Sequence, residues 1–279
     1  MKGFISILLA LVPWFQKSLF KKPIHIALSY DEEVGCLGVA PLISEMKKNI
    51  AKPLLVMVGE PTKLEIIDRH KSCHTFETEF FGKKAHSCNP NWGCNSIYYL
   101  SEFVNYISQL QDTLMEQGSD NNFDPPYSTL NVGMVIGGEA HNIVPDWSKL
   151  TWNVRYLPKI DDQGSIVNLV EKKLSYLQKI MQAEFQEAKI INRNISNIYP
   201  LVPQKGLENI DFVKHRIKSG QSGVSYGTDG GFFSYEGWPT IVCGPGSIEQ
   251  AHQPDEYIKV NDIKDGFLFI QQLLQAINS

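Results

Sequence analysis

The chain has 279 residues, a formal net charge of −4, 43% hydrophobic residues and 11% aromatic residues. That composition is typical of a folded globular protein, and the length favours about two domains. No basic stripe accompanies the mildly acidic balance, so nucleic acid is excluded as the main partner. Five cysteines without a C-x-x-C pair indicate reduced thiols in a cytoplasmic protein.

The first residues allow two interpretations. A charged start followed by an apolar run at 4–12 is similar to a signal peptide, but the run is too short to span a membrane, which needs about 20 apolar residues. The alternative is a buried helix over residues 4–15. In neither case does the pattern predict a membrane partner.

Helix and strand patterns alternate over residues 4–70. After the helix at 4–15, the sequence predicts a strand at 24–29, a helix at 38–48 and a strand at 54–58. Continuous apolar strands between helices are typical of a parallel sheet that is buried on both faces.

The middle of the chain has a different pattern. We expect a strand at 73–81 that alternates between two faces, with His74, Phe76, Thr78 and Phe80 sharing one of them. Next come a helix that Asn95 caps and that runs to about residue 114, strands at 128–136 and 150–157, a helix at 163–183 and a strand at 186–192. This β-α-β-β-α-β order is that of a ferredoxin-like unit.

The alternation of helices and strands returns near residue 198, with a helix at 212–218, a short buried strand at 239–243 and an amphipathic helix at 260–277. The predicted fold is therefore α/β. A catalytic domain with a parallel-rich sheet is built from residues 1–71 and 196–279, and a ferredoxin-like α+β lid and dimerisation domain is inserted at 72–195.

Three acidic residues, Asp31, Glu32 and Glu33, directly follow the apolar run at 24–30. Carboxylates at a strand end repel one another and lose hydration, so they need a compensating cation or water. A divalent metal supplies that compensation, and an unligated acid beside it can act as a base on the metal-bound water. A solvated acidic turn is the alternative for these three residues alone.

Two further positions could join such a site. Glu60 follows the strand at 54–58, and Pro61 forces its backbone into an extended shape. His252 lies in a loop rich in glycine and proline at 244–256. Carboxylates and imidazole suit zinc, manganese or cobalt. Taken singly, Glu60 could cap a helix and His252 could be an ordinary surface residue.

Together these segments resemble a known family. D-E-E-x-G at 31–35, G-E-P-T at 59–62, G-x-x-A-H-S-x-x-P at 82–90 and A-H-Q-P-D-E-Y at 251–257 carry the resemblance. They are similar to the co-catalytic metallopeptidases that include acetylornithine deacetylase, succinyl-diaminopimelate desuccinylase, aminoacylase and glutamate carboxypeptidases. The resemblance covers the whole chain, and segments 126–133 and 244–257 are most similar to the acetylornithine deacetylase branch.

The resemblance implies a role for each of four acidic or histidine side chains in the catalytic domain. Glu32 matches the general base, which takes a proton from a metal-bridging water and later gives it to the departing amine. Glu33 and His252 match two ligands of one metal, and Glu60 matches a ligand of the other. The family uses two divalent ions, zinc or cobalt.

The resemblance also implies roles for three lid residues. His86 matches a histidine that reaches across a dimer to the substrate carbonyl, where it would stabilise the oxyanion. Asn142 and Arg155 match positions that bind the substrate carboxylate, which the planar arginine fork can hold with two hydrogen bonds. On the pattern alone, His86 could be a turn residue, Asn142 a turn former and Arg155 a strand-edge charge.

The implied reaction is hydrolysis of N-acetyl-L-ornithine to acetate and L-ornithine, a step of arginine biosynthesis, by a homodimer that forms through the lid. Two alternatives stay open. One is a related hydrolase of N-acyl amino acids or peptides, of the desuccinylase or carboxypeptidase type, and the other is an inactive dimerising remnant.

The resemblance further implies a preceding segment with an H-x-D metal-binding histidine and a bridging aspartate directly before Met-Lys-Gly. This sequence begins at Met1-Lys2-Gly3. Residues 1–12 then match an internal helix rather than a signal peptide. We expect one metal to keep Glu33 and His252 and the other only Glu60, with weak metal binding and impaired activity as the result.

Overall fold

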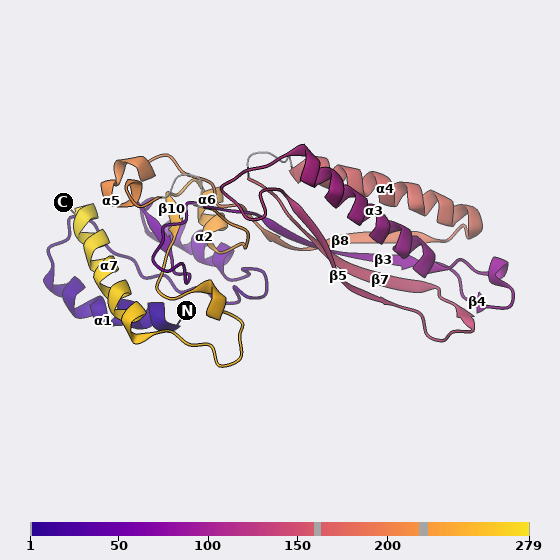
Figure 1. The fold of residues 1–279 in the computed structure, drawn as a ribbon, viewed down its shortest axis with the longest axis horizontal. Helices are drawn as coiled ribbons and strands as arrows, with labels where there is room; N and C mark the ends of the chain where they lie inside the picture. The colour runs from indigo at the N-terminus through magenta and orange to yellow at the C-terminus, as the bar shows by residue number, and fades with distance from the viewer. Residues whose placement is uncertain (1, 159–162, 218–222, 279) are drawn as a thin grey trace. The chain divides into compact units, whose positions relative to one another are not determined.

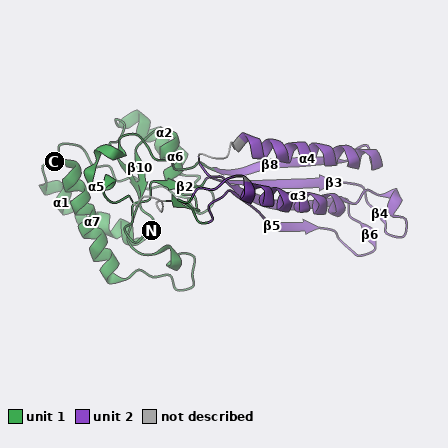
Figure 2. Ribbon diagram, turned by 45° about the horizontal axis from the view of Figure 1, so that its top comes forward, with its two compact units in different colours: residues 1–71, 121–124, 198–279 green, residues 72–120, 125–197 purple. Residues whose placement is uncertain are grey.

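The computed structural model describes residues 2–158, 163–217 and 223–278. Two compact units divide the chain: residues 1–71, 121–124 and 198–279 form the first, and residues 72–120 and 125–197 form the second (Figure 2). The sequence predicts residues 121–124 in the inserted domain, whereas the structure groups them with the first unit. These residues belong to the first unit because Asn122 accepts a hydrogen bond from the Gly223 amide at 3.1 Å and the Asp124 carbonyl accepts one from the Ser225 hydroxyl at 2.6 Å.

The second unit is a four-stranded sheet covered on one face by two long helices (Figure 1). Its elements are β3 (Cys73–Phe81), β4 (Ala85–His86), η1 (Pro90–Trp92), α3 (Ser96–Gln117), β5 (Thr129–Gly137), β6 (Ile143–Val144), β7 (Trp147–Arg155), α4 (Gln163–Glu184) and β8 (Lys189–Ile198). The strand order is β5-β7-β3-β8, and β7 runs antiparallel to both β5 and β3. Strands β4 and β6 form a separate two-stranded ladder.

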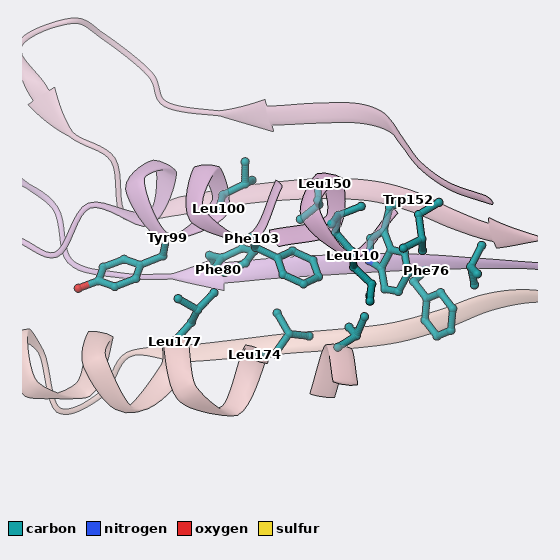
Figure 3. Packing of buried hydrophobic residues seen from close by; sticks show 14 of the residues in the cluster. Phe76, Phe80, Tyr99, Leu100, Phe103, Leu110, Leu150, Trp152, Leu174 and Leu177 are labelled. Atoms are coloured by element: carbon teal, nitrogen blue, oxygen red, sulfur yellow. The ribbon is translucent and has the colours of Figure 1, made fainter. Parts of the chain in front are cut away.

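Local sequence signals account for these elements. The Asn95 side chain accepts a hydrogen bond from the Ile97 amide at 3.0 Å and so caps α3, as the sequence predicts. The predicted alternation of β3 is confirmed, because its even-numbered residues are buried under the helices. Phe76 stacks on Trp152 with ring centroids 4.5 Å apart (Figure 3). The Trp152 indole donates to the Thr78 hydroxyl at 2.9 Å.

The first unit is built from short strands and helices taken from both chain ends. Its elements are α1 (Lys2–Lys17), α2 (Val39–Asn49), β1 (Val56–Val58), β2 (Arg69–His70), η2 (Leu207–Asn209), α5 (Asp211–Lys214), β9 (Gly223–Val224), α6 (Gly230–Tyr235), β10 (Thr240–Val242), η3 (Ile248–Gln250) and α7 (Val260–Asn278). Two parallel ladders occur, β1 with β10 and β2 with β9. Of the predicted helix at 212–218, the structure has α5, and Lys218 lies outside the described residues.

Helix α1 belongs to the core of the first unit. Ile7 and Leu11 are buried and share a cluster with Phe269, Ile270 and Leu273 of α7. The prediction of a buried helix over residues 4–15 is therefore confirmed. In the ranges that the structure describes, no helix is both long enough and apolar enough to cross a bilayer.

The predicted buried strand at 24–29 is wrong. These residues are irregular and mostly exposed, with 62% of Leu28 accessible to solvent. A strand forms only where its backbone groups meet a ladder partner, and the described residues provide none at this place. The next segment closes into a turn instead, in which the Tyr30 carbonyl accepts from the Gly38 amide at 3.1 Å.

Candidate metal and catalytic site

The turn that carries Glu32 and Glu33 has an unusual backbone. Asp31 and Cys36 adopt φ angles of 54° and 57°, a left-handed conformation that non-glycine residues rarely take, and Gly35 has φ 104°. The Glu32 carbonyl accepts from the amides of Gly35 and Cys36, at 3.1 and 2.9 Å. Within this turn Glu32 is half-buried, whereas Glu33 points into solvent.

The loop that follows β10 brings His252 to this turn. His252 also has a left-handed φ of 61°, and its Nε2 lies 3.4 Å from Oε2 of Glu33. Both side chains are more than two thirds exposed. An exposed pair of this kind adds little to stability, so the strained backbone is not explained by the pair alone.

Glu60 follows β1 and lies against the start of the same loop. Gly244 passes so close to the Glu60 carbonyl that an added Cβ would lie 2.5 Å from its oxygen, so only glycine fits there. Burial, with help from the nearby charge of Glu32, raises the pKa of Glu60 to about 7. Glu60 therefore lies within electrostatic reach of the acidic turn.

Burial also raises the pKa of Glu32 above the ordinary range of a glutamate, and the charges of Asp229 and Glu33 add to the effect. The charge of His252 lowers the pKa of Glu32, but this effect is small. A half-buried carboxyl whose pKa is raised accepts a proton more readily than an ordinary glutamate does, and this suits it to transfer a proton in a reaction.

The donor chemistry of the site suits a divalent ion, but the assembled donors are few. Glu33 and His252 offer a carboxylate and an imidazole to one ion, and Glu60 offers a carboxylate from another loop. Among the residues that the structure describes, no group of three or more histidine, cysteine, aspartate or glutamate side chains is arranged to hold a metal. The residues therefore fit partial coordination of one ion by Glu33 and His252.

Asp229 is the residue that the sequence reasoning missed. It is 6% exposed, it accepts a hydrogen bond from the Ser29 hydroxyl at 2.5 Å through Oδ2, and its Oδ1 is buried without a partner. Its charge contributes to the raised pKa of both Glu32 and Glu60. The only sequence signal was an acid inside the glycine-rich run at 227–231.

The second unit carries the three lid residues in two places. His86 pairs with Ile143 across the β4–β6 ladder, and the Asn142 carbonyl accepts from the Ser87 amide at 3.0 Å, so His86 and Asn142 are neighbours. Arg155 is the last residue of β7, whereas β6 lies just before the start of that strand. The nine residues of β7 span about 27 Å, which separates Arg155 from the other two.

Comparison with known proteins shows the family to which the chain belongs. The sequence profile described as Peptidase family M20/M25/M40 matches residues 1–276. The chain is 31% identical over 278 residues to the acetylornithine deacetylase of Salmonella arizonae, with 98% of this chain and 69% of that protein covered. It is 29% identical over 259 residues to the acetylornithine deacetylase of Buchnera aphidicola subsp. Acyrthosiphon pisum, with 93% and 66% covered.

Among solved structures, a tripeptidase from Staphylococcus aureus has the same fold, with a TM-score of 0.71, 16% identity, and 99% of this chain and 69% of that chain covered. The matches in sequence confirm the predicted resemblance: the chain belongs to peptidase family M20/M25/M40, a family of metal-dependent hydrolases. The chain spans about two thirds of the length of the acetylornithine deacetylases that it matches.

Proposed function

We propose that this chain hydrolyses the amide bond of N-acetyl-L-ornithine to acetate and L-ornithine, as a cytoplasmic enzyme of arginine biosynthesis. The observation that carries the proposal is the 3.4 Å approach of His252 to Glu33, two residues that lie 219 positions apart in the sequence and match the ligands of one metal. The acetylornithine deacetylase relatives support the choice of substrate.

The residues of the first unit have distinct tasks in this reaction. Glu33 and His252 would hold one divalent ion and Glu60 a second, with zinc or cobalt as candidates. Such an ion, when bound, polarises the scissile carbonyl and lowers the pKa of a water molecule. Glu32 accepts the proton that the attacking water loses, and it returns that proton to the nitrogen of the departing amine. Water and the amide are consumed, and one carboxylate and one amine are released.

The second unit would act as a lid in a homodimer. In one copy, Arg155 lies about 27 Å along β7 from the end where His86 and Asn142 are found, so one small substrate cannot contact all three from the same copy. His86 keeps its role across the dimer, and Asn142 and Arg155 keep the substrate carboxylate. Because Asn142 lies beside His86 and far from Arg155, we propose that Arg155 acts on the carboxylate in its own copy and that Asn142 reaches it from the second copy. Strand β5 is an edge strand with Met134, Val135 and Ile136 exposed, and it offers a surface for this pairing.

The test is an assay of the purified chain with added zinc or cobalt on N-acetyl-L-ornithine, N-succinyl-diaminopimelate and dipeptides. Glu32→Gln should reduce kcat on the preferred substrate by about 10²–10⁴-fold, because it removes the proton acceptor and keeps the shape. The exposed Glu45→Gln is the matched control and should have no effect.

A preference for another substrate on the panel would identify the desuccinylase or carboxypeptidase alternative. Absence of turnover on every substrate, at metal concentrations that saturate the thermal shift of the chain, would refute the hydrolytic function and leave the dimerising remnant.

A further inference from the structure

We propose that Asp229 is a positioning residue for Glu32: from the buried side, it fixes the segment 29–36 and so holds the Glu32 carboxyl in place. The inference depends on the proposed role of Glu32 and extends it to a residue that lies 197 positions further along the sequence.

Asp229 is bonded to one end of the segment that carries Glu32 and acts electrostatically on the other end. At the first end, the Ser29 hydroxyl donates to Oδ2 of Asp229 at 2.5 Å. At the other end lies Cys36, which is 1% exposed and whose thiol donates to Oε1 of Glu32 at 3.7 Å. Burial, together with the charges of Asp229 and Glu32, raises the pKa of Cys36, so the sulfur stays protonated and able to donate.

Asp229 does not perform the structural task that an aspartate usually has before a helix. Such a residue commonly caps the helix through its side chain, but Asp229 makes no cap bond to α6. The Thr228 hydroxyl accepts from the Gly230 amide at 3.0 Å instead. One buried oxygen of Asp229 has no partner, and this costs stability that a purely structural role would not explain.

The turn that carries Asp229 is held rigidly, as a positioning residue requires. The Thr228 hydroxyl donates to Nε2 of His70 at 3.1 Å, and Nδ1 of His70 donates to the Lys71 carbonyl at 2.8 Å. Burial lowers the pKa of His70 to about 4, so the ring is neutral and each nitrogen keeps one role. On the other side, an added Cβ at Gly231 would lie 1.8 Å from the Tyr199 carbonyl oxygen, so the backbone packs directly against Tyr199 and only glycine fits there.

The experiment follows the hydrogen bond from Cys36 to Glu32 by the infrared S–H stretching band of the metal-free chain. Cys36→Ala identifies the band by its loss, and Glu32→Gln shows how far the band moves when the acceptor weakens. Asp229→Ala should move the band to higher frequency and broaden it, because Glu32 is no longer held at the thiol. The exposed Asp211→Asn, at the start of α5, is the matched control and should leave the band unchanged.

A double variant separates positioning from a direct effect of Asp229 on the thiol. If Asp229 acts through Glu32, the shift caused by Asp229→Ala should be at least halved in a Glu32→Gln background. Equal shifts in both backgrounds, or an unmoved band in a folded Asp229→Ala chain, would overturn the inference. Should Asp229→Ala not fold, Ser29→Ala removes one anchor and is expected to give a smaller shift in the same direction, whereas an unmoved band in that variant would count against the inference.

The kcat and KM of the metal-loaded chain provide a second test of the role of Asp229. Asp229→Asn should lower kcat by about 10-fold or more and leave KM within about twofold, because proton transfer and not substrate binding is disturbed. A change in KM alone would contradict the inference. If the unmodified chain does not hydrolyse any substrate, the proposed function fails, and the infrared result still decides whether Asp229 holds Glu32.

Discussion

Two buried groups, His70 and Glu60, should change the stability of the metal-free chain in opposite directions on acidification. His70 is fully buried, and burial lowers its pKa from 6.5 to about 4. The unfolded chain therefore binds this proton first, and the stability that neutral His70 provides above pH 6.5 is lost as the pH falls towards 4. With 1.36 kcal/mol for each pKa unit, the loss amounts to about 3 kcal/mol.

The titration of Glu60 changes the stability of the fold in the opposite direction. Burial and the charge of Glu32 raise its pKa from 4.5 to about 7. The folded chain takes up this proton first, so stability is gained as the pH falls from 7 towards 4.5, by about 3 kcal/mol again. In the unmodified chain these two effects nearly cancel between pH 7 and 4.5, and the raised pKa of Glu32 adds a gain of stability as the pH falls.

The assay is urea unfolding with a metal chelator at several pH values. Relative to the unmodified chain, Glu60→Gln should lose about 3 kcal/mol on acidification, because it removes the compensating group, whereas His70→Gln should gain about as much. Glu45→Gln is the matched control and should follow the profile of the unmodified chain. A Glu60→Gln profile equal to that of the unmodified chain, or a loss of stability relative to it for His70→Gln, would refute the reasoning.

Three further outcomes are expected. Thr228→Val should cost about 3 kcal/mol in urea unfolding, because it leaves His70 Nε2 and a buried amide unpaired, whereas a cost equal to that of Thr228→Ser would contradict the importance of the hydroxyl. Trp152→Phe should cost about 2 kcal/mol, since the bond to Thr78 and part of a buried ring are lost; an unchanged unfolding midpoint would count against this packing. Val135→Lys should halve the mass measured by light scattering without altering the circular dichroism, and a persistent dimer would exclude β5 as the interface.

The elements of the second unit could be predicted because their causes are local. The alternation over residues 73–81 predicted β3, and Asn95 with the helical pattern behind it predicted α3. An N-cap and a period of two act within a few residues, so the chain itself contains the necessary information.

The same reasoning did not work at residues 24–29. Their apolar pattern shows that the segment could be buried as a strand between neighbouring strands. It does not show that such neighbouring strands are present. In the tertiary structure no ladder partner is present there among the described residues, and Leu28 is exposed.

For the site, the sequence by itself determined the chemical types of the side chains and the family to which they point: Glu32 and Glu33 behind an apolar run, Glu60 before a proline and His252 in a glycine-rich loop. Only the tertiary structure decided which of them meet. It placed His252 at 3.4 Å from Glu33, and it brought Asp229 to Ser29, 200 residues earlier in the chain. No local pattern encodes such contacts, because they arise when distant segments are packed together and their buried polar groups must find partners.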